Sequence, residues 1–330
     1  MRRRDVLAGL LATTAASALQ AAEPNRVYRL AICEGAEVTH PLENWVWSTM
    51  FARLGQLGYT EGKNLTVERH NAKGQAEHYA EIARNIVEAK PDVILVSLNH
   101  QLAAQVAKAT STIPIVTAIG SADSGIVRNI SRPEGNITGI LFDAGIEMQG
   151  KHLDLLRQAA PAASRVAYLS NRYDWEGAWG RAVLEAGRQS GISIIGVTVE
   201  DSAGEQEYRQ AFETMAQQSV NAVVVNGLFP NYLYRELIAE LALKHRLPSI
   251  CWSPDLVEKG QVPMAYAAYF PDFPERLAEL VSQVLSGVRV ADIPLAQPTK
   301  FIFAINLKTA KALGLDIPHT LTAQADVLIE

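Results

Sequence analysis

Apolar and polar positions follow two periods along the chain, one typical of strands and one typical of helices. Nearly continuous apolar runs of a few residues predict buried strands, and apolar residues three or four positions apart predict helices. Between residues 27 and 119, strands and helices alternate. The expected strands are 27–33, 64–71, 91–98 and 113–119, and the helices between them are 45–57, 76–89 and 100–110. This alternation predicts a parallel sheet with right-handed crossovers.

The alternation restarts after a turn-rich interval. The expected strands are 164–171, 192–199, 221–227 and 247–252, with helices at 148–159, 179–190, 208–217 and 232–245. The residues after 263 add a helix at 274–285, a strand at 301–305 and a short helix at 306–313. We therefore expect an α/β protein with two Rossmann-like lobes, each built on a parallel sheet.

The interval between the two units, RNISRPEGNITG at 128–139, is rich in Gly, Pro, Asn and Ser. These residues favour turns, so we interpret the interval as a crossing between lobes, continued by a connecting strand in 137–143. Gly135 and Gly139 are expected to relieve backbone strain there. Glu134 is expected to keep a negative φ, because a side chain at positive φ costs about 1 kcal/mol.

The first 22 residues have the order of a secretory signal peptide, with three arginines, a short apolar stretch and several alanines. The run RRDVL at 3–7 resembles the twin-arginine pattern, and a Sec signal with a basic start is the alternative. Cleavage near Ala21 or Ala22 removes three Arg and one Asp from 30 basic and 35 acidic residues, which changes the formal charge from −5 to −7. We expect export to the periplasm.

Composition narrows the class of protein. The 330 residues are 48% hydrophobic and 20% charged, which is ordinary for a globular protein. An acidic chain without a Lys- and Arg-rich run beyond residue 4 is not expected to bind nucleic acid. Cys33 and Cys251 are expected to be buried thiols, with a disulfide as the alternative.

Enzyme and metal motifs are absent from the sequence. It contains no phosphate-binding glycine loop, no HExxH or CxxC metal motif and no GxSxG nucleophile elbow. The seven histidines are dispersed, and we interpret them as solvated or capping residues. No catalytic residue, metal or cofactor is therefore expected.

Several stretches resemble one family. The segment ADIPLAQPTKFIFAINLKTAKALGLDIPHTLTAQADVLIE at 291–330 is similar to the C-terminal signature of bacterial ABC-transporter substrate-binding proteins, which include the tryptophan/tyrosine-binding type. The stretches LGYTEGKNLTVERHNAKG, PDVILV, AKATSTIPIV and KHLDLLRQAAPAASRVAYLSN agree with it. The resemblance covers nearly the whole chain after the signal. It implies a type I periplasmic binding protein fold, in which two lobes joined by crossing strands close on a ligand that is delivered to a membrane permease.

The resemblance also implies how the chain divides. Residues 23–141 and about 264–290 are expected to form the first lobe, and residues 142–263 and about 291–330 the second, with the ligand cleft between them. A monomer is expected. The sequence departs from the family pattern at three places: at Glu134, where glycine is usual, at 123–125, where Asp-Pro-Val is frequent, and in the aromatic-rich loop 170–180. These departures affect the ligand more than the fold.

The carboxyl ends of parallel strands, where loops and helix N-termini meet, predict the ligand site. Ser97, Asn99 and Ser121 stand at helix starts suited to a carboxylate, and Asn171 and Asn226 end second-lobe strands. The candidates for pairing with an ammonium group are Glu34, Asp123 and Asp255. The candidates for apolar or stacking walls are Trp45, Tyr173, Trp175, Phe229 and Trp252. Helix capping, solvated loop acids and core packing are the respective alternatives.

These residues suit a small polar ligand with an apolar body. We expect an exported solute-binding protein of an ABC importer that binds an amino acid with an aromatic or branched apolar side chain by closure of two lobes. The alternatives are a periplasmic ligand sensor that serves a receptor kinase, and a binder of an aromatic carboxylate or a nucleoside-like compound. The expected partners are the ligand and an inner-membrane permease.

Overall fold

The computed structural model describes most of the chain. The described residues are 26–35, 41–97, 99–120, 126–127, 129–133, 135–142, 145–200, 202–269 and 271–330, without the side chains of 41–44 and 229. The expected signal peptide and residues Ser121, Asp123 and Glu134 lie outside these ranges. In the described part of the chain, no helix has the length and apolar content needed to cross a membrane.

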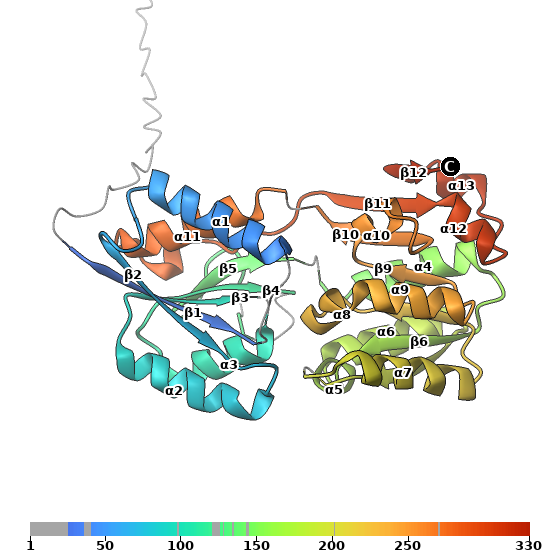
Figure 1. Ribbon diagram of the computed structural model, residues 1–330, viewed down its shortest axis with the longest axis horizontal. Coiled ribbons are helices and arrows are strands. Elements are labelled where there is room, and N and C mark those ends of the chain that lie inside the picture. Colours follow the sequence, from blue (N-terminus) through green and yellow to red (C-terminus); the bar gives the residue numbers. More distant parts are fainter. Residues whose placement is uncertain are drawn as a thin grey trace, which may run out of the picture.

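The first lobe is built on a five-stranded parallel sheet of order β2-β1-β3-β4-β5 (Figure 1). The strands are β1 (Tyr28–Glu34), β2 (Leu65–Asn71), β3 (Val93–Ser97), β4 (Ile115–Ile119) and β5 (Ile137–Leu141). One face is covered by α1 (Pro41–Gln56) and α11 (Phe273–Leu285), and the other by the 3-10 turn η1 (Ala76–His78), α2 (Tyr79–Ala89) and α3 (His100–Ala109). Because helices cover both faces, β3 and β4 are buried along almost their whole length.

The second lobe is built on a seven-stranded sheet of order β12-β11-β10-β9-β8-β6-β7. The strands are β6 (Arg165–Ser170), β7 (Ser193–Thr198), β8 (Ala222–Val225), β9 (Ser249–Cys251), β10 (Met264–Ala268), β11 (Phe301–Asn306) and β12 (Val327–Ile329). One face is covered by α4 (Met148–Ala159), α6 (Ala178–Ser190), α12 (Leu307–Ala312) and α13 (His319–Thr322). The other is covered by α7 (Glu205–Gln217), α9 (Arg235–Lys244) and α10 (Pro254–Glu258), and the short helices α5 (Arg172–Glu176) and α8 (Phe229–Leu233) follow β6 and β8.

The predicted fold class is confirmed, with one strand pairing that was not expected. Neighbouring strands run parallel except β10 and β11. The chain leaves the second lobe after β10, passes through α11 and the 3-10 turn η3 (Val290–Asp292) in the first lobe, and returns into β11 (Figure 1). Because the chain leaves the sheet at the end of β10 and returns at the same end into β11, these two neighbouring strands run in opposite directions.

The lobe boundaries differ from the expected ones at two points. β10, expected in the first lobe, pairs with β9 and β11 of the second sheet. Residues 291–296, expected in the second lobe, lie along β5 of the first. There the Thr138 hydroxyl donates to the Ile293 carbonyl at 2.8 Å, and the Ala296 amide donates to the Gly139 carbonyl at 2.9 Å. Strand pairing, rather than the position of turn residues, decides where the chain crosses.

The turn-rich interval 128–139 lies within the first lobe in its described residues, 129–133 and 135–139, which corrects its interpretation as the crossing. It leads from β4 into β5, the edge strand of the five-stranded sheet. The Asn136 side chain donates to the Ile113 carbonyl at 2.6 Å and so holds the turn against the preceding connection. A Cβ on Gly139 would lie 1.8 Å from the Thr117 carbonyl oxygen. Glycine at this position therefore allows β5 to pair closely with β4.

Three crossings join the lobes, one after β5, one after β10 and one before β11. The second and third lie side by side, because the Tyr269 amide donates to the Lys300 carbonyl at 2.9 Å and the Lys300 ammonium lies 5.2 Å from the Tyr269 ring centre. After β5, Phe142 packs against Phe273 of α11 with ring centres 4.6 Å apart. Any change in the angle between the lobes must be taken up in these segments.

Most of the predicted strands and helices are present within a few residues of their expected bounds. The region 170–180, expected to be a loop, holds α5 and the start of α6. The helix expected at 232–245 is divided into α8 and α9 at Tyr234. β10, α10, α13 and β12 are short elements that were not predicted.

Cys33 and Cys251 are both buried and free, as predicted. Burial raises the pKa of the Cys251 thiol to about 12 and raises that of Cys33 as well. Both thiols therefore stay protonated and pack as small apolar side chains.

Candidate functional site

A cleft of about 380 Å³ lies where the first turn of α3 in the first lobe faces α5 and α6 in the second. Its lining residues are His100, Tyr173, Asp174, Glu176, Gly177, Ala178, Trp179 and Arg181. The volume suits a small organic molecule.

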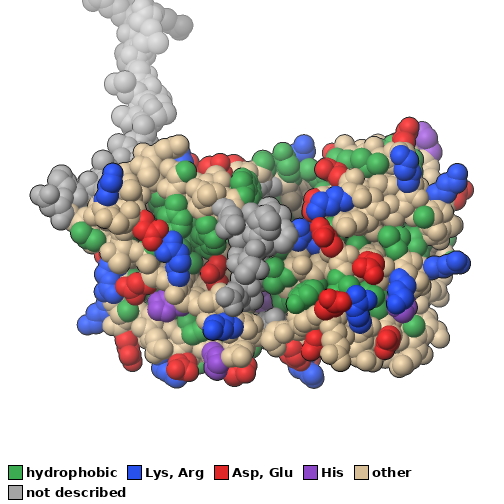
Figure 2. Space-filling model, in the orientation of Figure 1, with side chains coloured by type: hydrophobic (Ala, Val, Ile, Leu, Met, Phe, Trp, Pro, Cys, Tyr) green, Lys and Arg blue, Asp and Glu red, His purple; other side chains and the backbone are tan. Residues whose placement is uncertain are grey.

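Acidic and basic side chains are interspersed over the visible face of the molecule (Figure 2). In the described part of the chain, no three His, Cys, Asp or Glu side chains gather as metal ligands would.

Asp174 borders the cleft and is only 3% exposed. Its backbone amide donates to the Asn171 side chain at 2.8 Å, because Asn171 caps the N-terminus of α5. Its Oδ2 accepts a hydrogen bond from the Asn226 side chain at 2.9 Å. Two predicted site residues, Asn171 and Asn226, therefore fix the position of a carboxylate that was not predicted from the sequence.

His100 reaches the same carboxylate from the other lobe. Its Nε2 lies 3.1 Å from Asp174 Oδ1, an ion-pair distance when the imidazole is protonated. The imidazole also packs against Tyr173, with ring centres 5.1 Å apart. The two lobes therefore approach each other closely at this point of the cleft. The interpretation of the histidines as solvated or capping is wrong for His100, whose side chain is 16% exposed.

Asn99, next to His100, caps α3. Its side chain accepts a hydrogen bond from the Leu102 amide and donates one to the Tyr79 hydroxyl, both at 2.8 Å. The capping alternative therefore accounts for the side-chain oxygen, and the bond to Tyr79 accounts for the nitrogen. A Cβ on Gly35, which follows β1, would lie 2.1 Å from the Asn99 nitrogen, so a larger residue there would require the Asn99 side chain to move.

Glu34 and Ser97 end the neighbouring strands β1 and β3, where they are register partners. Burial raises the pKa of the Glu34 carboxyl, and hydrogen bonds with the Trp47 and Asn71 side chains act in the opposite direction. Side chains of its own lobe therefore hold this carboxylate. Trp45, on α1, is 44% exposed. None of these three candidates is among the described residues that line the cleft.

The aromatic side chains near α5 have different surroundings. Tyr173 is 47% exposed and lines the cleft. Trp179, which was not predicted, also lines it, and its ring lies 3.5 Å from where a Cβ on Gly120 of the first lobe would stand. Trp175 instead packs against β7, where a Cβ on Gly196 would come within 2.2 Å of the indole. The core-packing alternative describes Trp175.

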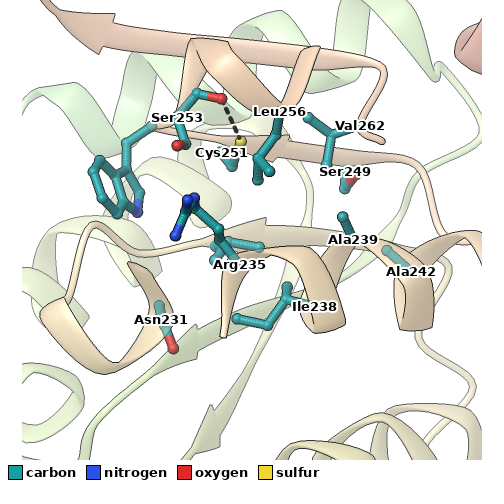
Figure 3. Close-up of a pocket in the computed structure, with 12 residues that line it drawn as sticks. Asn231, Arg235, Ile238, Ala239, Ala242, Ser249, Cys251, Ser253, Leu256 and Val262 are labelled. Carbon is teal, nitrogen blue, oxygen red and sulfur yellow. Dashed lines mark hydrogen bonds between the residues drawn. The ribbon is translucent and has the colours of Figure 1, made fainter. Parts of the chain in front are cut away.

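Trp252 and Asp255 belong to a compact cluster around Arg235 in the second lobe. The Trp252 indole donates to the Asn226 carbonyl at 3.1 Å, and the buried Arg235 guanidinium lies 3.5 Å from the Asp255 carboxylate. The Ser253 hydroxyl also donates to this carboxylate. Arg235 extends from α9 toward Ser253 (Figure 3). The cavity here has a volume of about 10 Å³, enough for one water at most.

Of the eight residues that line the cleft, only Tyr173 was predicted from the sequence. His100, Asp174 and Trp179 are among the seven that were not. Asp174 had a local signal, since it stands three residues after Asn171 at the spacing of a helix cap. The only sequence signal for His100 was its position shortly after the end of a predicted strand. Among the predicted residues, Phe229 begins α8, and its side chain, like Ser121 and Asp123, lies outside the described part of the structure.

The sequence is similar to one protein family and to a curated protein. The model of a family described as ABC transporter substrate binding protein matches residues 36–329. The tyrosine-binding protein of Clostridioides difficile strain R20291 is 23% identical over 282 residues, which cover 84% of this chain and 79% of that protein.

Solved structures share the two-lobed fold. A conserved domain protein from Vibrio cholerae is 21% identical with a TM-score of 0.75, over 92% of this chain and all of that chain. An ABC domain from Streptococcus pneumoniae in complex with L-Trp is 18% identical with a TM-score of 0.74, over 91% of this chain and all of that chain. The ligand-free, open structure of a substrate binding protein from Clostridium difficile has a TM-score of 0.59 at 19% identity, over 92% and 99% of the two chains.

Proposed function

The chain belongs to the family of ABC transporter substrate-binding proteins, and on this premise we propose that it is the exported solute-binding component of an ABC importer. The ligand in this proposal is an amino acid with an aromatic or branched apolar side chain. Family members bind solutes and do not catalyse reactions, so the chain is not an enzyme.

The composition of the inter-lobe cleft carries the proposal. The buried Asp174 carboxylate lies beside the exposed Tyr173 ring and opposite the first turn of α3. A few fixed polar groups beside aromatic walls suit a small ligand with a charged end and an apolar body. The relatives agree with this class, since one is a tyrosine-binding protein and another is in complex with L-Trp.

Closure of the lobes couples binding to delivery. A ligand in the cleft contacts both lobes only while they are closed, so its higher affinity for the closed form shifts the open-closed equilibrium. The paired crossings at Tyr269 and Lys300 absorb the hinge motion. The closed form is then the one that a permease recognises.

A thermal-shift screen tests the ligand class. The protein without residues 1–22 is heated with L-tryptophan, L-tyrosine, L-phenylalanine, L-leucine, an aromatic carboxylate without an amine, and a nucleoside. An amino acid present at 100 times its Kd should stabilise the protein by about 2.7 kcal/mol and raise its melting temperature. If the aromatic carboxylate or the nucleoside raises the melting temperature and no amino acid does, the ligand assignment is wrong.

Delivery to a permease places the protein outside the cytoplasm, and residues 1–22 are the export signal in this proposal. N-terminal sequencing of the protein from a periplasmic fraction should find a chain that begins near residue 22 or 23. A periplasmic chain that still begins at Met1 would rule out the cleavable signal.

A further inference from the structure

Asp174 is a buried carboxylate with one occupied and one open oxygen. Oδ2 accepts the hydrogen bond from Asn226, whereas Oδ1 has no hydrogen-bond partner among the described residues. Removing an ionised carboxylate from water is costly unless an opposite charge or several donors compensate it. The Oδ1 side of Asp174 therefore favours a cation.

The basic side chain that faces Oδ1 belongs to the opposite lobe. Within the described ranges, His100 is the one basic side chain at ion-pair distance from Asp174. Nearby arginines are engaged elsewhere, since Arg181 donates to a backbone carbonyl of α5 at 3.3 Å and Arg172 lies 3.4 Å from Glu200. When the lobes separate, His100 moves away with α3, and Oδ1 is left facing the open cleft.

We propose that Asp174 Oδ1 binds the protonated amine of the ligand, on the side of the carboxylate that His100 occupies in this structure. This inference rests on the proposed function and assigns the group of the protein that binds the ammonium of the ligand. Tyr173 and Trp179 line the same cleft, so an aromatic side chain close to the ammonium has walls to pack against. An aromatic carboxylate without an amine leaves Asp174 uncompensated and binds weakly.

The test compares amino acids with analogues that lack one charged group. L-tyrosine and L-tryptophan are titrated calorimetrically, together with 3-(4-hydroxyphenyl)propanoate and indole-3-propanoate, which lack the amine. In the wild type, at least one amino acid should bind about 100-fold more tightly than its analogue, which is the usual effect of losing one partner of a buried charge pair. Tyramine and tryptamine, which keep the amine, should retain part of the affinity.

Asp174→Asn should remove the discrimination. It keeps the shape of the side chain, so the amino acid should bind about 100-fold more weakly while the desamino analogue keeps its affinity. Asp154→Asn is the matched control, because it makes the same change at a half-exposed position on α4, outside the cleft lining. This variant should bind both compounds as the wild type does.

The outcomes separate the two proposals. If Asp174→Asn still prefers the amino acid, or weakens both compounds equally, Asp174 is not the ammonium site and the proposed function stands. If the wild type binds the desamino analogue as tightly as the amino acid, the inference is wrong even if the variant does not fold. If neither the amino acids nor the amines bind, the proposed function in its aromatic form fails, and the inference fails with it.

Discussion

Burial decides the charge of His152, whose ring lies inside the second lobe between α4 and β10. It lowers the pKa of the imidazole, because the protonated ring would lose its hydration. Nε2 lies 2.8 Å from the Tyr266 carbonyl oxygen, which can only accept, so the neutral ring carries its proton on Nε2. The interpretation of the histidines as solvated or capping is wrong for this residue too.

We predict that His152 makes the protein less stable as the pH falls. Below the ordinary histidine pKa of about 6.5, the unfolded chain binds a proton at this side chain, whereas the folded protein, with its lowered pKa, does not. The free energy of unfolding of the wild type should therefore decrease between pH 8 and pH 5. His152→Gln, which keeps a donor for the Tyr266 carbonyl, should make this decrease smaller.

Urea unfolding at the two pH values measures the effect. His319→Gln changes an exposed histidine at the start of α13 and should keep the wild-type decrease. An equal decrease in His152→Gln and in the wild type would show that His152 does not contribute to the pH dependence.

Tyr173 and Trp252, both predicted as aromatic walls, should respond differently to substitution. Tyr173→Ala removes an exposed ring from the cleft, so ligand affinity should fall by about 0.5 to 1.5 kcal/mol with little change in stability. Trp252→Ala removes an indole that donates to the Asn226 carbonyl and packs 5.3 Å from the Tyr232 ring centre. We expect it to lower the free energy of unfolding by about 3 kcal/mol. Chemical unfolding and calorimetric titration of both variants would distinguish the roles, and equal stability losses would contradict them.

At the scale of elements, the pairing of β4 and β5 depends on Gly139. We predict that Gly139→Ala lowers the free energy of unfolding by about 2 kcal/mol or more, because the added Cβ lies 1.8 Å from a backbone oxygen of β4 and the strands must move apart. Gly55→Ala is the control, since no atom lies within 4 Å of its Cβ position on α1. This change should stabilise the protein by about 0.5 to 1 kcal/mol. Urea unfolding measures both, and a neutral Gly139→Ala would show that the strands tolerate the separation.

Regular elements could be predicted where burial is strong. β3 and β4 are covered on both faces and appear in the sequence as continuous apolar runs. β10 was missed because its five residues MAYAA contain three alanines, and their pattern is too short and weak to distinguish it from a connection. α5 was missed because a five-residue helix has no apolar period to detect.

The candidate site could be predicted only in part, because it depends on how the lobes meet. Asn171 and Asn226 were predicted because they follow strands of one sheet, and in the structure they hold Asp174 without lining the cleft themselves. The contact between His100 and Asp174 joins two lobes, and no spacing within the sequence specifies the angle at which the lobes close. Trp175 and Tyr173 are two residues apart on α5, and only the structure shows that one packs against β7 and the other lines the cleft.

At the scale of the whole molecule, two parts of the structure affect how the lobes close: the cleft and the crossing segments. His100 and Asp174 bring the lobes within 3.1 Å of each other at the cleft, while the crossings after β5, after β10 and before β11 connect the lobes through the chain. A ligand acts at the cleft, and the crossings set how far the lobes can separate. Substitutions in the crossings should therefore change affinity without touching the ligand.

The excursion of the chain from β10 through α11 and back into β11 also affects the order of folding during synthesis. One face of the first sheet carries α1 and α11, and α11 supplies buried residues such as Leu277 and Val281 to that core. These residues emerge from the ribosome long after β5 is complete. Until α11 has been synthesised, the first lobe therefore has an incompletely covered apolar face. Exposed apolar surface of this kind is prone to aggregation, and chaperones protect it until the chain has folded.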